Sequence, residues 1–416
     1  MSAPQVDLHS AEPQATPGHA VRWVLAATVI SGLSGFVIML LAVGALGNAG
    51  YAVFGVYWSS LFLVVGILFG IQQETTRATA VELGTPSPSR RRRSLWAFSA
   101  LIAAGVVAVV LVTSVWWAPR TLGEANAGLA VPVALGAGAN VFVATFSGVF
   151  AGAGKWRHLA AIIALDAVLR FGGVVGVLAL GGDLQLLAWS IILPFPLSLV
   201  IVTLAAPRTT MTLSWTSLGL GRLLRNSAQT VLAATAMALI VNGFPTVLAF
   251  FARPDQNEEL GALILAITFT RAPILVPMFA LQSYLITRFA GSPAGPWRLI
   301  GQAFAVIAVL MVFLAGASAL WGDRLFDLSA SALVPLVVSS GFIGALCVTG
   351  SALVARGALR ANTTGWIVAA VVSIAVLFIP LTLETRAAVA LSAGPLAGLA
   401  VQWVCLRRGT RRLSDA

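Results

Sequence analysis

The sequence predicts an all-α polytopic membrane protein with about twelve transmembrane helices, arranged as two six-helix bundles. Three observations predict this fold class. The chain is 59% hydrophobic and 9% charged, with a mean hydropathy of +0.95, whereas soluble domains carry roughly 25% charged residues. Apolar stretches of about 20 residues, the length of a membrane span, recur along the whole chain. Basic residues gather in alternate connections between these stretches.

The apolar stretches divide the chain into twelve expected spans. They cover residues 23–46, 51–73, 95–116, 128–150, 159–181, 184–205, 228–251, 260–286, 298–320, 331–354, 363–381 and 387–406. Residues 1–20 are polar and contain three prolines, so we expect a disordered cytoplasmic N-terminus there. The first apolar run is too long for the core of a signal peptide, and we expect it to be an uncleaved span.

The charges in the connections predict the orientation of the chain. One set of alternate connections, which includes the run Arg90–Arg93, holds about five times more Lys and Arg than the other set. The other set carries loop acids such as Glu258 and Glu259. Because basic loops stay in the cytoplasm, we expect a multi-pass protein of the bacterial plasma (inner) membrane with both termini cytoplasmic. The net charge of +11 thus comes from basic residues that set the topology. These residues also contact membrane lipids, and no nucleic-acid partner is expected.

Weak internal repeats divide the spans into two halves. Residues 24–28 (VLAAT) recur at 231–235, and Phe69-Gly-Ile-Gln72 resembles Phe279-Ala-Leu-Gln282 about half the chain later. Six spans in each half make the repeats parallel. The expected organisation is an N-terminal bundle at 21–206, a cytoplasmic linker at 207–226, a C-terminal bundle at 227–406 and a basic cytoplasmic tail at 407–416. The linker sequence fits either an amphipathic segment on the membrane surface or an irregular loop.

Charged residues at membrane depth are the first candidates for function, because they are costly there unless they face a cavity or a partner. Arg271 lies near the middle of the eighth span, just before Pro273 and Pro277. A guanidinium group stays charged and binds phosphate through two parallel hydrogen bonds. Arg271 is therefore a candidate phosphate ligand in a cavity. The alternative is a structural arginine bonded to neighbouring carbonyl groups.

A second candidate is the pair Asp166 and Arg170 in the fifth span. The two residues are four positions apart, so their side chains share a helix face and form an ion pair. One hypothesis is a neutralised structural bridge. The other is that Asp166 takes up a proton, or that it orients Arg170 toward a substrate.

Other polar residues complete the candidate set for a phosphate and sugar cavity. Several lie at the ends of the second and eighth spans, where they either line a cavity entrance or form the solvated end of a helix: Gln72, Gln73, Glu74, Arg77 and Gln282. Asn140 and Asn242 are amides within spans four and seven, suited to holding helices together or to lining the cavity. No metal site or cofactor is expected, because the three histidines and two cysteines show no ligand spacing.

The chain is not expected to be an enzyme. It has no phosphate-binding loop sequence of the kind that nucleotide hydrolases use. Its expected external connections are short, so none is the large acidic loop that a membrane glycosyltransferase would be expected to show.

The segment from Ala45 to Tyr57 (ALGNAGYAVFGVY), together with Arg271 and Leu281-Gln282 in the second half, resembles the multidrug/oligosaccharidyl-lipid/polysaccharide (MOP) flippases, in the polysaccharide-exporter (Wzx-like) branch. Ala52 departs from the second glycine usual in that motif. The resemblance implies a V-shaped pair of bundles around a central cavity and alternating access. It also implies a partner, a polyprenyl-phosphate- or diphosphate-linked glycan flipped from the inner to the outer leaflet for envelope polysaccharide synthesis. Arg271 would contact the phosphate, with Arg170 and Arg77 as further ligands.

Two other functions remain open at this stage. One is a small-molecule or multidrug antiporter of the same fold, which would want acidic residues in its cavity. The other is a non-transporting scaffold that recruits envelope glycosyltransferases as partners, and such a scaffold would tolerate replacement of Arg271.

Overall fold

The computed structural model describes residues 17–83, 93–217, 220–290, 297–326 and 330–414. Most of the expected disordered segment 1–20, most of the run Arg90–Arg93 and the last two residues of the expected tail 407–416 lie outside these ranges. The described chain is almost entirely helical, as the sequence predicts. Its elements in order are α1 (Pro17–Leu83), β1 (Arg93–Ser94), α2 (Leu95–Leu122), η1 (Glu124–Leu129), α3 (Ala130–Gly152), α4 (Trp156–Ala179), α5 (Leu184–Ile192), α6 (Pro194–Ala205), α7 (Pro207–Leu213), β2 (Trp215–Thr216), α8 (Leu220–Ala238), η2 (Leu239–Gly243), α9 (Phe244–Ala249), η3 (Pro254–Gln256), α10 (Asn257–Ala290), α11 (Trp297–Phe326), α12 (Ala330–Ala355), α13 (Leu359–Leu377) and α14 (Leu383–Ser414).

Eleven helical segments in the described ranges are long and apolar enough to cross a membrane. The first contains two spans, because α1 has 67 residues and would measure about 100 Å if straight, against a hydrocarbon core of about 30 Å. It breaks at Gly47, whose positive φ of 66° a side chain would oppose. Twelve spans result, at the predicted places. Spans one and two are the two arms of α1, α4 is span five, α8–η2–α9 is span seven and α10 is span eight.

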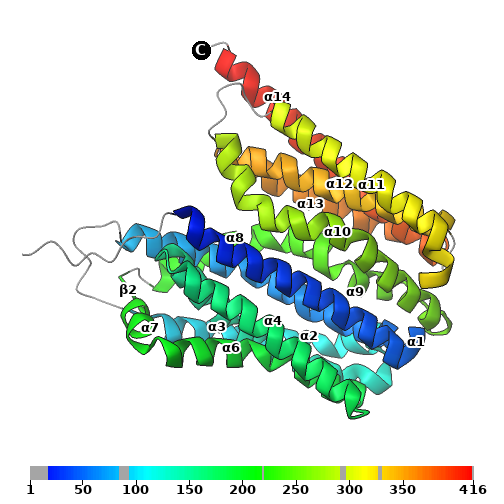
Figure 1. Cartoon of the computed structure of the whole chain (residues 1–416), viewed down its shortest axis with the longest axis horizontal. Helices are drawn as coiled ribbons and strands as arrows, with labels where there is room; N and C mark the ends of the chain where they lie inside the picture. The colour runs from blue at the N-terminus through cyan, green and yellow to red at the C-terminus, as the bar shows by residue number, and fades with distance from the viewer. Residues whose placement is uncertain (1–16, 84–92, 218–219, 291–296, 327–329, 415–416) are drawn as a thin grey trace, which may run out of the picture.

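The two halves are joined most broadly at one end of the molecule. A single hydrophobic cluster there includes Tyr51 and Leu122 from the first half and Leu248, Leu260 and Leu383 from the second. These residues flank the connections that the charge pattern assigns to the outside. At the opposite end, the core separates into clusters that belong mainly to one half or the other. Figure 1 shows the consequence: α11, α12 and α14 spread away from α3 and α6 toward the end that holds the C-terminus. This is the V-shaped pair of bundles that the resemblance to the MOP flippases implies.

Between the halves, α1 packs against α8 and α10 through glycines. A Cβ atom added to Gly55 would lie 2.8 Å from Ile264, and one added to Gly70 would lie 2.5 Å from the backbone nitrogen of Val231. Small residues let membrane helices approach closely and pack by van der Waals contact. Spans one and two therefore face spans seven and eight along their length, and the space that remains between them lies at membrane depth.

The linker between the halves docks on the first half. Residues 215–216 pair as β2 with β1 in a short antiparallel ladder. The carboxylate of Glu82 accepts hydrogen bonds from the Thr216 hydroxyl (2.9 Å) and the Ser217 amide (2.8 Å). Within the expected linker 207–226, the described residues thus form a short helix, a strand and the start of α8.

Candidate functional site

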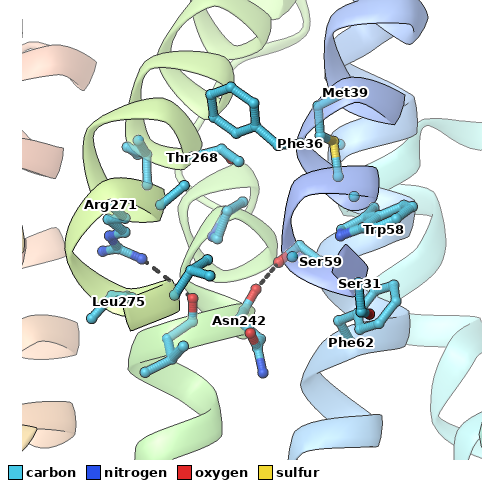
Figure 2. Close-up of a pocket in the computed structure, with 18 of the residues that line it drawn as sticks. Ser31, Phe36, Met39, Trp58, Ser59, Phe62, Asn242, Thr268, Arg271 and Leu275 are labelled. Atoms are coloured by element: carbon cyan, nitrogen blue, oxygen red, sulfur yellow. Dashed lines mark hydrogen bonds between the residues drawn. The ribbon is translucent and has the colours of Figure 1, made fainter. Parts of the chain in front are cut away.

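A cavity of about 310 Å³ lies between the two halves. Its lining comes from both arms of α1, from α4, from the η2–α9 segment and from α10. Figure 2 shows Ser31, Phe36, Trp58 and Phe62 on the α1 side, facing Arg271 and Thr268 across it. Among the lining residues, Arg170 and Arg271 are the charged ones. The cavity is therefore largely apolar, with hydroxyl groups, the amide of Asn242 and two guanidinium groups as its polar features.

Span seven is broken beside this cavity. Residues 239–243 form a single π-helical turn, in which the hydrogen bonds reach five residues back instead of four. The residue five positions after Ile240 and four after Val241 is Pro245, which has no amide hydrogen to donate. The carbonyl groups of Ile240 and Val241 thus lack the helical donor that any other residue at 245 would offer. An uncompensated buried carbonyl is costly.

Arg271 supplies the missing donor. Its Nη1 atom donates to the carbonyl oxygen of Ile240 at 3.0 Å and to that of Val241 at 3.5 Å. The guanidinium carbon lies 5.6 Å from the centre of the Phe244 ring. The structural alternative for Arg271, bonding to neighbouring carbonyls, thus describes one of its three nitrogens.

The other two nitrogens of Arg271, Nε and Nη2, are buried and have no hydrogen-bond partner among the described residues. The residue is only 5% exposed, and no acidic group in the described chain pairs with it. A buried donor without an acceptor costs about 1–3 kcal/mol, and more when it is charged. Arg271 is therefore a cation held at the cavity by one edge, with its other edge unsatisfied.

Ser59 of span two completes the break in span seven. Its hydroxyl group donates to the carbonyl oxygen of Asn242 at 2.5 Å and accepts from the amide of Thr246 at 3.2 Å (Figure 2 draws the first bond). In an uninterrupted α-helix that amide and that carbonyl would bond to each other. A side chain of the first half is thus inserted into the backbone of the second, next to the cavity.

Arg170 lies in a box of aromatic rings on the first half. Its guanidinium carbon is 4.8 Å from the ring centre of Phe195, 5.0 Å from that of Phe62 and 5.9 Å from that of Trp58. Its Nη2 atom bonds to both carboxylate oxygens of Asp166 at 2.6 Å, the ion pair that the four-residue spacing predicts. Because Asp166 neutralises Arg170, the net positive charge at the cavity comes from Arg271.

The predicted candidates divide into two groups in the structure. Arg271, Arg170 and Asn242 line this cavity, and Asp166 is bonded to Arg170 but is not part of the lining. Of the candidates whose side chains are described, the others lie outside its lining: Gln72, Gln73, Glu74, Arg77 and Asn140. Glu74 is buried near the end of α1, where it pairs with Arg77 through two bonds (2.9 and 2.6 Å) and accepts from the side-chain amide of Asn226 at 3.0 Å.

Three further candidates are also away from the cavity lining. Gln72 is half-buried and Gln73 is exposed on the same stretch of α1, while Asn140 is buried on α3. Gln282 lies on α10, but its side chain is outside the described set. No group of three or more His, Cys, Asp or Glu side chains in the described chain is arranged to hold a metal ion.

Sequence reasoning overlooked Ser59, Pro245 and the aromatic rings of Trp58 and Phe62. A signal for the first two exists in the sequence, since Asn242-Gly-Phe-Pro245 interrupts an otherwise continuous span and Ser59-Ser60 places two hydroxyl groups at membrane depth. The aromatic pair has no such signal, because Trp and Phe are common in any apolar span.

Comparison with known proteins places the chain in a family. No protein-family model matches it. The uncharacterized protein Mb3654 of Mycobacterium bovis is 32% identical over 403 residues, which cover 94% of this chain and 92% of that protein. This chain belongs to the Mb3654 family. The uncharacterized protein Rv1510 of Mycobacterium tuberculosis is a more distant relative, 29% identical over 399 residues with the same coverage of both chains.

The Mb3654 family member described here has the fold of MOP superfamily transporters. The inward-facing conformation of a multidrug resistance MATE family transporter superposes with a TM-score of 0.68 at 14% identity, covering 95% of this chain and 99% of the other. The outward-facing conformation gives 0.63 at 16% identity, with 97% and 98% covered. A MOP superfamily transporter from Pyrococcus furiosus, described as having a binding pocket of reverse polarity, gives 0.58 at 15% identity, with 97% and 98% covered. At these identities the likeness shows the fold alone, which is the fold predicted from the sequence.

Proposed function

We propose that this protein is a transporter that moves a phosphate-bearing amphiphile, a polyprenyl-phosphate- or diphosphate-linked sugar, from the inner to the outer leaflet by alternating access. The MOP fold supports a transport role, since solved structures of this fold are described as transporters. The observation that carries the choice of substrate is Arg271, a buried cation at a membrane-depth cavity with two donor nitrogens unsatisfied. Phosphate oxygens are strong acceptors for guanidinium groups.

The rest of the cavity suits such a substrate. Trp58, Phe62 and Phe36 give the α1 side an aromatic surface on which the apolar face of a sugar ring can rest, and Ser31, Ser34 and Thr268 add hydroxyl groups. A lipid tail would stay in the surrounding membrane while the headgroup passes through the cavity. Binding sites of this kind combine apolar walls with a few placed polar groups.

A multidrug antiporter is the second candidate, because the MATE transporters that share the fold are described as multidrug resistance proteins. The sign of the cavity charge argues against a cationic drug. Asp166, the acid that the described residues place at the site, is already paired with Arg170 and is not part of the cavity lining.

A reconstituted flipping assay tests the proposal. Full-length protein is placed in liposomes that contain a polyprenyl diphosphate carrying a fluorescent hexosamine, and dithionite quenches the label in the outer leaflet only. We expect wild-type vesicles to lose nearly all fluorescence with time and Arg271→Met vesicles to lose only the label already outside. Arg253→Met is the matched control, because Arg253 is an exposed loop arginine.

Three results would overturn this function. The first is equal flipping by wild-type and Arg271→Met vesicles when both proteins melt at the same temperature. The second is the absence of flipping by the wild type together with proton-driven uptake of ethidium, which would establish the antiporter. A protein that does neither, yet is retrieved from cells with glycosyltransferases, would be the scaffold.

A further inference from the structure

The unsatisfied edge of Arg271 has a specific shape. Nε and Nη2 lie on the same side of a guanidinium group, and their N–H bonds run parallel. Arg77 uses this same pair of atoms to bind both carboxylate oxygens of Glu74, at 2.9 and 2.6 Å. The free edge of Arg271 is therefore matched to two oxygens of a single oxyanion group, as found in a phosphate or a carboxylate.

The orientation of that edge depends on Nη1 on the opposite side. Nη1 is held by the carbonyl oxygens of Ile240 and Val241. Both carbonyls are available because the helical donor for each would be the amide of residue 245, which is proline. Any other residue at 245 would bring an N–H group that competes with Nη1 for the same two oxygens.

We infer that Pro245 is a positioning residue for anion recognition, because it leaves two carbonyls free to hold Nη1 and so directs the Nε–Nη2 edge of Arg271 to a single oxyanion. This inference rests on the proposed function and identifies Pro245 as the residue that sets the anion selectivity of the site. Pro245 itself also lines the cavity, so the break in span seven and the anion site are one structural unit. The ring of Pro245 is secondary; the missing N–H group is what matters.

Binding of geranyl phosphate to the full-length protein in detergent micelles tests the inference, and geraniol is the uncharged reference ligand. Tryptophan fluorescence reports binding, because Trp58 lines the cavity. We expect Pro245→Ala to weaken geranyl phosphate binding about tenfold, the effect of losing one well-placed charged hydrogen bond, with geraniol binding unchanged. Pro119→Ala is the matched control. Pro119 also lies within a membrane helix, α2, but is not part of the cavity lining.

A backbone substitution separates the missing N–H group from the proline ring. The α-hydroxy analogue of alanine at position 245 removes the N–H group as proline does, yet has no ring. We expect it to restore the affinity for geranyl phosphate that Pro245→Ala loses. If the hydroxy-acid protein binds as weakly as Pro245→Ala, the inference is wrong and the ring itself is required.

The outcomes distinguish this inference from the proposed function. If Arg271→Met abolishes the preference for geranyl phosphate over geraniol but Pro245→Ala does not, the function stands and the positioning role falls. If the wild type has no such preference, the proposed function falls. The positioning role of Pro245 is then decided by ¹⁵N NMR of the Arg271 side chain. If Pro245 has this role, the hydrogens on Nη1 exchange slowly with water in the wild type and faster in Pro245→Ala. If Pro245→Ala is too unstable for titration in micelles, the NMR comparison is made with the hydroxy-acid protein instead. We expect Nη1 of that protein to exchange as slowly as in the wild type.

Discussion

The Ser59 hydroxyl group donates a hydrogen bond of 2.5 Å to the carbonyl oxygen of Asn242, 183 residues later in the chain. Span two thereby supplies part of the hydrogen bonding that span seven lacks at its break. Ser59→Ala leaves this carbonyl and the amide of Thr246 without their partner, and we expect a loss of about 1–3 kcal/mol of stability. Thermal melting in detergent measures it. Ser114→Ala is the control, since the Ser114 hydroxyl bonds to Leu111 in its own helix, and an equal effect of both variants would contradict the prediction.

The Asp166–Arg170 pair should behave as a buried ion pair. Asp166→Asn leaves the Arg170 guanidinium buried without a carboxylate, and we expect a loss of about 3–5 kcal/mol of stability. The double variant Asp166→Asn/Arg170→Met should regain much of it, because both charges are then removed. Asp255→Asn, at an ion pair whose side chains are both 72% exposed, should change little. Melting temperatures are compared for the wild type, the three variants above and the single variant Arg170→Met. Additive losses at 166 and 170 would argue against a coupled pair.

Gly70 should control how closely spans two and seven approach. A Cβ atom at this position would lie 2.5 Å and 2.6 Å from backbone atoms of Val231 and Thr230, so Gly70→Val cannot be accommodated by a side-chain rotation. We expect a loss of at least about 1–3 kcal/mol of stability and a lower yield of folded protein. Gly105→Val is the comparison, since no described atom lies within 4 Å of a Cβ placed there. Equal yields and melting temperatures would show that this contact is dispensable.

The predicted orientation can be tested on the intact chain. After Cys347 and Cys405 are replaced by serine, single cysteines are introduced at the exposed positions Arg208 and Asp255. A maleimide that cannot cross membranes should label Asp255→Cys in intact cells and Arg208→Cys only after permeabilisation, because the charge pattern assigns position 208 to the cytoplasm. The reverse labelling pattern would invert the topology and place both termini outside.

The positions of the spans could be predicted from sequence because each rests on a local run of apolar residues. Arg271 and Arg170 could be singled out because charge at membrane depth is rare in any chain. The π-helical turn could not, since one extra residue per turn leaves the local composition unchanged. The bonds of Ser59 to Asn242 and of Glu74 to Asn226 join residues far apart in sequence. Such contacts depend on how the two halves dock, and a single sequence carries no direct record of that arrangement.

The hydrophobic cluster around Tyr51, Leu122, Leu248 and Leu260 joins both halves at the end of the predicted external loops. In an energised membrane, voltage falls most steeply across the driest layer along a path. A headgroup beside Arg271 would then still be near the electrical potential of the compartment it came from. The work on its charge, about 2.3 kcal/mol per elementary charge per 100 mV, would be done almost entirely while this layer opens and reseals. The layer is thus where the membrane potential can favour one direction of movement over the other.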